Sequence, residues 1–239
     1  ALTRDGERRD ALLHRAAEHE AEADPDAACR ALEGILARTP THRPSLETLA
    51  RLRDASGHHA ALVNVYERLL PIAAPEERAR LHTRIAETRE RALADDAGAI
   101  AAYRQALALE DRATVRDALA RALERTGRWE ELAACRREQL DRLEEPAERA
   151  AAAHALGVLL EEKLSDPARA LEAHELALRA DPLFRPALDA RERLLTDAQA
   201  WDRLAEAIAA EAEASSDGFE RTQASLRKAL VLAHRGAPI

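Results

Sequence analysis

The 239-residue sequence predicts an all-α protein made of stacked antiparallel helical hairpins. Apolar residues recur with the helical period of 3.6 along nearly the whole chain and never alternate, which favours helices over strands. Ala, Leu, Glu and Arg are abundant, and these are strong helix formers. Asp24, Asp95 and Asp166 each open a similar segment, so the sequence repeats with a period of 71 residues. A fixed period of this length predicts a repeat array, which usually presents a binding surface and seldom a catalytic cleft.

Residues that start and stop helices place the elements in order along the chain. Asp166-Pro167 combines an N-cap acceptor with a proline at the first helical position. Gly57 and Gly127 lie where a helix is expected to end in a left-handed residue. Connections of a few residues make consecutive helices antiparallel neighbours. About thirteen helices are expected, at residues 7–22, 26–38, 43–55, 58–71, 75–93, 96–109, 113–126, 129–143, 147–163, 167–180, 185–196, 199–213 and 217–234.

Each 71-residue unit holds two hairpins, and the hairpin at residues 147–182 has small and large residues at the set positions of a known motif. The matching residues are Leu156, Gly157, Leu160, Ala170, His174, Ala177 and Pro182. On these residues the chain resembles the tetratricopeptide repeat (TPR) family, a helix–turn–helix motif of 34 residues. Other copies replace the Leu-Gly pair by Leu49-Ala50 and Leu119-Ala120, whereas the segment 183–213 lacks the pair.

The TPR resemblance implies a right-handed α-solenoid of antiparallel helical hairpins. We expect one solenoid over residues 1–239, with a leading helix at 7–22 and doublets of hairpins at 24–94, 95–165 and 166–236. The repeat pattern is incomplete at both ends, and neither end has an obvious polar capping helix. The chain is therefore expected to be a segment of a larger bacterial TPR-containing protein.

Several classes of function are disfavoured by composition and motifs. A net charge of −8 without a basic stripe argues against nucleic acid as a partner. No run of 18 apolar residues predicts a membrane span, and a cytoplasmic location is expected unless a targeting segment lies outside this sequence. No metal-binding, nucleophile or phosphate-loop motif occurs, so we expect no enzyme activity, no cofactor and no metal.

The histidines and cysteines are interpreted as packing residues. His174 occupies the repeat position of Tyr103, which is expected to be in the core. Cys29 and Cys135 lie where other copies have apolar residues and are 106 positions apart, so two buried free thiols are expected and a disulfide is not.

The resemblance also implies where a partner would bind. In TPR arrays the first helix of each hairpin lines a concave groove, and a protein or peptide segment lies in it. The stripe on these helices consists of Glu47, Arg51, Thr83, Glu87, Asp117, Arg121, His154 and Val158. TPR clamps for a chaperone's C-terminal carboxylate use Lys and Asn in this stripe, and their absence here disfavours that partner.

The sequence thus predicts a non-enzymatic TPR-like scaffold that mediates protein–protein interaction. Three alternatives remain open. The chain could be a homo-oligomerising or spacer module, in which its faces contact other copies. It could be the regulatory region of an enzyme whose catalytic domain lies outside these residues. An RNA-binding helical array is the third alternative, and the acidic charge balance disfavours it.

Overall fold

The computed structural model describes residues 2–235, which form thirteen α-helices, one short 3-10 helix and no strand. The helices are α1 (Leu2–Glu20), α2 (Pro25–Arg38), α3 (Arg43–Ala55), α4 (His59–Leu69), α5 (Pro75–Ala92), α6 (Asp96–Leu109), α7 (Ala113–Arg125), α8 (Trp129–Leu140), α9 (Pro146–Leu164), α10 (Pro167–Ala180), α11 (Arg185–Asp197), α12 (Trp201–Ala214) and α13 (Gly218–Arg235). The 3-10 helix η1 (Leu70–Ile72) follows α4 directly. The predicted all-α class and the thirteen helices are confirmed for this range.

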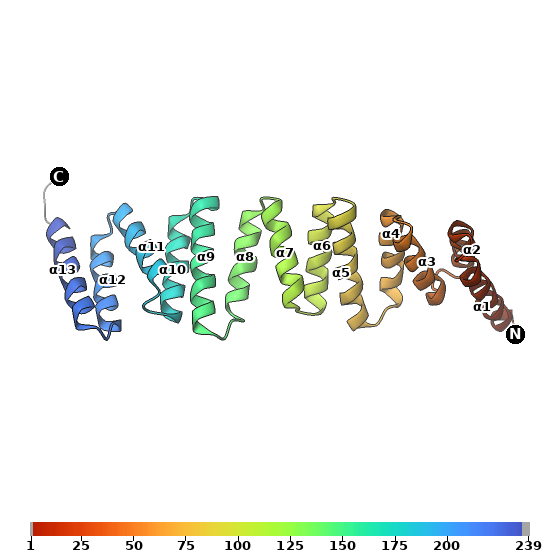
Figure 1. Cartoon of the computed structure of the whole chain (residues 1–239), viewed down its shortest axis with the longest axis horizontal. Helices are drawn as coiled ribbons and strands as arrows, with labels where there is room; N and C mark the ends of the chain where they lie inside the picture. Colours follow the sequence, from red (N-terminus) through yellow and green to blue (C-terminus); the bar gives the residue numbers. More distant parts are fainter. Residues whose placement is uncertain (1, 236–239) are drawn as a thin grey trace. The chain divides into compact units, whose positions relative to one another are not determined.

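The chain divides into two compact units, unit 1 at Ala1–Thr126 and unit 2 at Gly127–Ile239. Within each unit, helices that follow one another in sequence pack as antiparallel neighbours, for example α5 with α6 and α9 with α10 (Figure 1). The antiparallel hairpins expected from short connections are therefore present. The assignment of all 239 residues to one solenoid with three doublets stays a prediction, and residue 236, the end of the third doublet, lies outside the described range.

The 71-residue period coincides with a repeated helix N-cap. Asp24, Asp95 and Asp166 precede α2, α6 and α10. Each carboxylate accepts a hydrogen bond from the backbone N–H three residues later, at 2.8 Å for the first and 2.9 Å for the other two. Such a bond satisfies one of the free donors of the first turn and stabilises a helix by about 1 kcal/mol. The aspartates that define the 71-residue period are thus the N-caps of the second helices of three hairpins.

Small residues allow the two helices of a hairpin to approach closely. Ala28, Ala99 and Ala170, one per repeat, are completely buried. Gly157 of α9 is the extreme case, because a Cβ added there would lie 2.3 Å from Cε1 of His174 on α10. The expectation that Gly157 permits close packing is confirmed, and the structure identifies the His174 ring as the group that needs the space.

One of three equivalent turns between helices differs from the sequence prediction in an informative way. Gly57 and Gly127 adopt left-handed conformations, with φ of +69° and +67°, as expected. Gln199 takes the same place before α12 with φ +52°, although it has a side chain. The left-handed region costs a non-glycine residue about 1–2 kcal/mol, so this turn is strained relative to its counterparts.

Some predicted boundaries and one burial assignment were wrong. The first helix extends from Leu2 to Glu20 and not from 7 to 22, and α8 ends at Leu140, three residues before the expected 143. A backbone turn bond from Arg142 to Gln139 forms where the helix was expected to continue. Both cysteines are free, but only Cys29 is buried, whereas Cys135 is partly exposed. Cys135 lies on the half of α8 that faces away from the core.

Candidate functional site

The predicted stripe lies on four helices that belong to two units. Glu47 and Arg51 are on α3, Thr83 and Glu87 on α5, and Asp117 and Arg121 on α7, all in unit 1. His154 and Val158 are on α9 in unit 2. Unit 1 therefore carries six of the stripe residues and unit 2 carries the other two.

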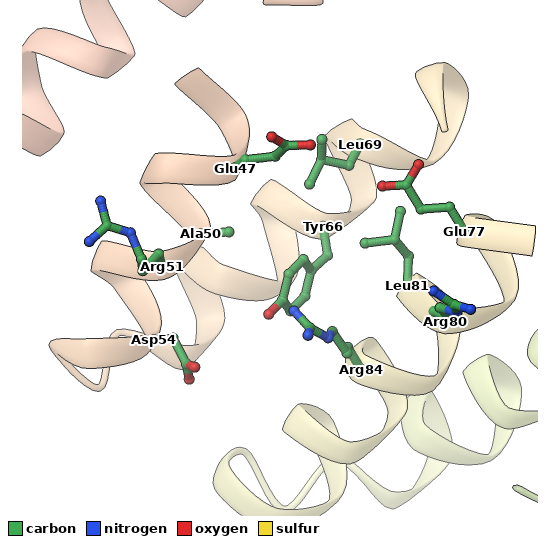
Figure 2. A pocket seen from close by; sticks show the side chains of 10 residues that line it. All are labelled: Glu47, Ala50, Arg51, Asp54, Tyr66, Leu69, Glu77, Arg80, Leu81 and Arg84. Carbon is green, nitrogen blue, oxygen red and sulfur yellow. The ribbon is translucent and has the colours of Figure 1, made fainter. Parts of the chain in front are cut away.

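The first hollow of unit 1 has a volume of about 490 Å³ and is bounded by α3, α4 and α5. Figure 2 shows Tyr66, Leu69 and Leu81 at its centre, with charged side chains around them. The lining residues are Glu47, Ala50, Arg51, Asp54, Tyr66, Leu69, Glu77, Arg80, Leu81 and Arg84. An apolar centre with a charged rim suits a partner that has both apolar and charged side chains.

The carboxylates on the rim of this hollow are largely neutralised from within the protein. Arg43 donates to Glu47 at 2.7 Å and to Glu77 at 2.6 Å, so one guanidinium holds two carboxylates. The guanidinium of Arg84 lies 6.0 Å from the ring centroid of Tyr66, and no carboxylate lies within 4 Å of it. Arg51, Arg80 and Arg84 thus leave positive charge available at the rim.

The second hollow of unit 1 has a volume of about 410 Å³ and lies between α5, α6 and α7. At its base, the hydroxyl of the buried Tyr103 donates to Glu90 at 2.6 Å, and Arg125 donates to the same carboxylate at 2.8 Å. Burial acts to raise the pKa of Glu90, but the hydrogen bonds from Tyr103 and Arg125 outweigh it and hold the pKa below its usual value. Burial, with the neighbouring carboxylate of Glu90, raises the pKa of Tyr103 far above its usual value. This pair therefore keeps one fixed ionisation state across the physiological pH range.

The two hollows contain five of the six stripe residues of unit 1. Glu47 and Arg51 line the first hollow, while Thr83, Glu87 and Arg121 line the second. Asp117 lines neither. The sequence did not identify the other main lining residues, Tyr66, Arg80, Arg84 and Tyr103, because the stripe was drawn on the first helix of each hairpin and on one edge of it. Tyr66 and Tyr103 lie on the second helices of their hairpins, α4 and α6, and Arg80 and Arg84 lie on α5 at positions outside the predicted stripe.

His154 of α9 belongs to a buried chain of hydrogen bonds in unit 2. Nε2 of His174 lies 3.1 Å from Oε1 of Glu161, and Nδ1 of His174 lies 3.2 Å from Nδ1 of His154. Arg193 of α11 donates to the other oxygen of Glu161 at 2.6 Å. His174 is completely buried, so its neutral ring donates to the carboxylate and accepts from His154. Phe184 covers His154 edge-on, at 5.8 Å between ring centroids.

These two histidines resist protonation. Burial lowers the pKa of His154, and the neighbouring His174 lowers it further. Burial also lowers the pKa of His174, and this effect exceeds the opposite effect of Glu161. Burial acts to raise the pKa of Glu161, but the hydrogen bonds from Arg193 and His174 bring it below its usual value. The structure thus assigns His154 to an internal contact as well as to the predicted stripe, while Val158 on the same helix is partly exposed.

Ion pairs connect helices across the hairpins more than the sequence indicated. In unit 1, Arg68 of α4 pairs with Glu33 of α2 at 3.1 Å and Arg125 of α7 pairs with Glu90 of α5 at 2.8 Å. In both pairs the partners are 35 positions apart, about one hairpin. Such exposed pairs contribute only tenths of a kcal/mol each, but they occupy carboxylates that a partner would otherwise meet.

The described residues contain no group of three or more His, Cys, Asp or Glu that could hold a metal ion. None of the helices in residues 2–235 combines the length and the apolar character that crossing a membrane requires.

No protein-family model matches the sequence, and a search of curated proteins finds no match. Solved structures similar to this chain include YrrB, described as a TPR protein with an unusual peptide-binding site, at a TM-score of 0.42 and 16% identity over 75% of this chain and 90% of that one. The TPR2AB domain of yeast Sti1 in complex with pHSP90 aligns at 0.36 and 13% identity, over 94% and 97% of the two chains. A tetratricopeptide repeat protein from Parabacteroides merdae aligns at 0.40 and 16%, over 91% and 83%. Solved TPR structures are among those to which this chain is similar.

Proposed function

We propose that this chain is a non-enzymatic protein-interaction module that holds a segment of a partner protein along the two hollows of unit 1. The observation that supports this function is the sharing of α5 by both hollows. Leu81 and Arg84 face one hollow and Thr83 and Glu87 face the other. An extended or helical segment that follows α5 would contact both.

The charge along these hollows favours an acidic partner, although the chain as a whole is acidic. Glu47, Glu77 and Glu90 are each bound to an arginine of the protein. Among the described residues, no arginine lies within 4 Å of the two other lining carboxylates, Asp54 and Glu87. Within the same range, five lining arginines have no carboxylate within 4 Å, and they are Arg51, Arg80, Arg84, Arg91 and Arg121. The charge that a partner would meet is therefore mainly positive.

A selection from a random peptide library, followed by affinity measurements, tests this function. Selected peptides should be enriched in Asp and Glu, and their affinity should fall with added salt. Arg84→Glu and Arg121→Glu should each weaken binding at least tenfold, since each converts attraction into repulsion. Arg30→Glu is the matched control, because Arg30 is an exposed arginine on α2 that lines neither hollow. Peptides that bind both groove variants as tightly as the unaltered chain would exclude the groove.

A second candidate function, self-association, is favoured by one surface of unit 2. Phe219, Leu226 and Leu230 on α13 have 69%, 62% and 70% of their surface exposed. Their spacing of seven and four residues places them on one face of the helix. Light scattering across a range of concentrations should show a dimer that Leu226→Glu disrupts. A constant monomer mass at all concentrations would remove this candidate.

A further inference from the structure

An arginine of unit 2 occupies a repeat position that is leucine in the core of the other copies. Gly57, Gly127 and Gln199 end equivalent turns, and the residues eight positions before them are Leu49, Leu119 and Arg191. Leu49 and Leu119 are 0% and 5% exposed. Arg191 of α11 therefore places a guanidinium where the repeat otherwise buries a hydrocarbon side chain.

Among the residues that the structure describes, no carboxylate pairs with the guanidinium of Arg191. It is partly buried, and its Nη2 donates to the backbone oxygen of Ala207 at 3.0 Å. The carboxylates that act on it from a distance belong to Glu175, Glu192 and Glu211. Each of these carboxylates already lies within 4 Å of another arginine. Arg203 pairs with Glu175, and Arg227 pairs with Glu192. Glu211 pairs with both Arg185 and Arg227.

This uncompensated charge is unfavourable for the folded chain alone. Burial lowers the pKa of Arg191, which means that its surroundings disfavour the charged form. A buried charge without a close counter-ion destabilises a protein, and an apolar residue of similar volume is often more stable. A residue with this property at a core position points to a role outside folding.

Arg191 faces a hollow of about 390 Å³ formed by α10, α11 and α12. Leu178 and Leu195 give this hollow apolar walls, and Arg179 adds a second guanidinium that has no carboxylate within 4 Å. Arg203 also lines it but is paired with Glu175 at 3.1 Å. No residue of α9 lines the hollow, so it is separate from the stripe residues His154 and Val158.

We propose that this hollow recognises a glutamate or aspartate side chain on an apolar segment of a partner protein, and that Arg191 binds the carboxylate. A guanidinium binds a carboxylate through two parallel hydrogen bonds, and a partly dehydrated site strengthens them. Leu178 and Leu195 contact the apolar neighbours of the acidic residue. Glu175 and Glu206 also line the hollow, so a singly charged carboxylate fits better than a doubly charged phosphate.

Fluorescence anisotropy with a labelled peptide of alternating glutamate and leucine tests this site in the full chain carrying Arg84→Glu and Arg121→Glu, which remove the acidic-peptide binding proposed for unit 1. This chain should bind it at least tenfold more tightly than a matched peptide of alternating glutamine and leucine. Arg191→Leu, which restores the residue of the other repeats, should reduce the affinity for the acidic peptide at least tenfold. It should also raise Tm by about 2–4 °C, because the unpaired charge is replaced by a residue that packs.

Arg137→Met is the matched control, since Arg137 is an exposed arginine of unit 2 on α8 that lies outside the hollow. It should leave peptide affinity unchanged. The Arg191→Lys variant keeps the charge and should bind the acidic peptide several-fold more weakly than the chain with arginine, because an ammonium group cannot form two parallel hydrogen bonds to one carboxylate. Three results would overturn the proposal: equal peptide affinity in Arg191→Leu, a lower Tm in that variant, or tighter binding of a phosphoserine peptide than of the glutamate peptide. Binding at this site does not depend on the unit 1 hollows, so it should persist when Arg84 and Arg121 are both replaced by glutamate.

Discussion

Hairpins α5–α6 and α9–α10 bury a polar ring at the same repeat position, with different chemistry in the two units. Tyr103 and His174 are 71 residues apart, and so are their carboxylate partners, Glu90 and Glu161. The Tyr103 hydroxyl donates to Glu90 at 2.6 Å, and Nε2 of His174 lies 3.1 Å from Glu161. In each case an arginine from the following odd-numbered helix binds the same carboxylate.

The residues that contact these two rings also differ between the units, and in each unit they suit the size and hydrogen bonding of the ring. Ala86 of α5 corresponds to Gly157 of α9, and Thr83 corresponds to His154. In unit 2 the missing Cβ makes room for the imidazole, and the second histidine uses its remaining nitrogen. Unit 1 thus has a contact whose groups keep their charge state across the physiological pH range, whereas the two histidines of unit 2 have pKa values below their usual value and become protonated in more acidic solution. Equivalent carboxylates, Glu90 and Glu161, thus hold a tyrosine in one unit and a histidine that acid can protonate in the other.

The largest expected effect comes from filling the space at Gly157. Gly157→Ala places a Cβ within 2.7 Å of three ring atoms of His174, and the ring is held on both sides by Glu161 and His154. We expect a loss of about 1–3 kcal/mol of stability from this overpacking, measured by thermal or urea unfolding.

Gly34→Ala is the control for this change. Gly34 lies in α2 with nothing within 4 Å of an added Cβ, so alanine should stabilise the helix by about 0.5–1 kcal/mol. Opposite signs for the two substitutions would support the close contact. A Gly157→Ala variant as stable as the unaltered chain would mean that the hairpins of the two units pack alike.

An intermediate effect is expected from pH, and it should originate mainly in unit 2. His154 and His174 have lowered pKa values in the folded chain, so the unfolded chain binds protons first as pH falls through about 6.5. The free energy of unfolding is therefore highest above that pH and falls below it, by at most about 1.4 kcal/mol per pH unit for each histidine. Urea unfolding between pH 7.5 and 5.5 measures this slope.

Replacing the two histidines of unit 2 by the residues at the equivalent positions of unit 1 tests whether they cause this pH dependence. A chain with His154→Thr and His174→Tyr should show a smaller slope, with the remainder including His82 of α5, whose pKa burial also lowers. His82→Gln is the comparison variant and should reduce the slope only by that remainder. An unaltered slope in the double variant would place the pH dependence outside this pair.

The smallest effect concerns the turns that precede α4 and α12. Gly57 in unit 1 and Gln199 in unit 2 both have positive φ, at +69° and +52°. Gln199→Gly should stabilise unit 2 by about 1 kcal/mol or less, because glycine adopts this conformation without steric cost but loses more entropy on folding. Gly57→Gln should have the opposite sign. Unfolding curves for both variants check this, and two changes of the same sign would contradict it.

The sequence located most of the fold because its signals are local. The N-cap carboxylates, such as Asp95, and the left-handed glycines act within a few residues of themselves, so they can be recognised without a tertiary structure. The predicted helix boundaries were wrong where no such residue marks the end of the helix, as at Leu140. The stripe was partly informative, since Arg121 lines a hollow and Asp117 does not.

The sequence by itself determined thirteen helices, their order and the repeat phase that makes Tyr103 equivalent to His174. Only the tertiary structure decided which polar groups meet. Glu161 and His174 are thirteen positions apart across a turn, and their contact depends on how closely α9 and α10 approach at Gly157. The lack of a carboxylate partner for Arg191 among the described residues likewise depends on carboxylates that other arginines already bind. Helical periodicity fixes the face on which a residue lies, whereas hydrogen-bond and ion-pair partners depend on distances between helices, which the pattern of a single chain does not contain.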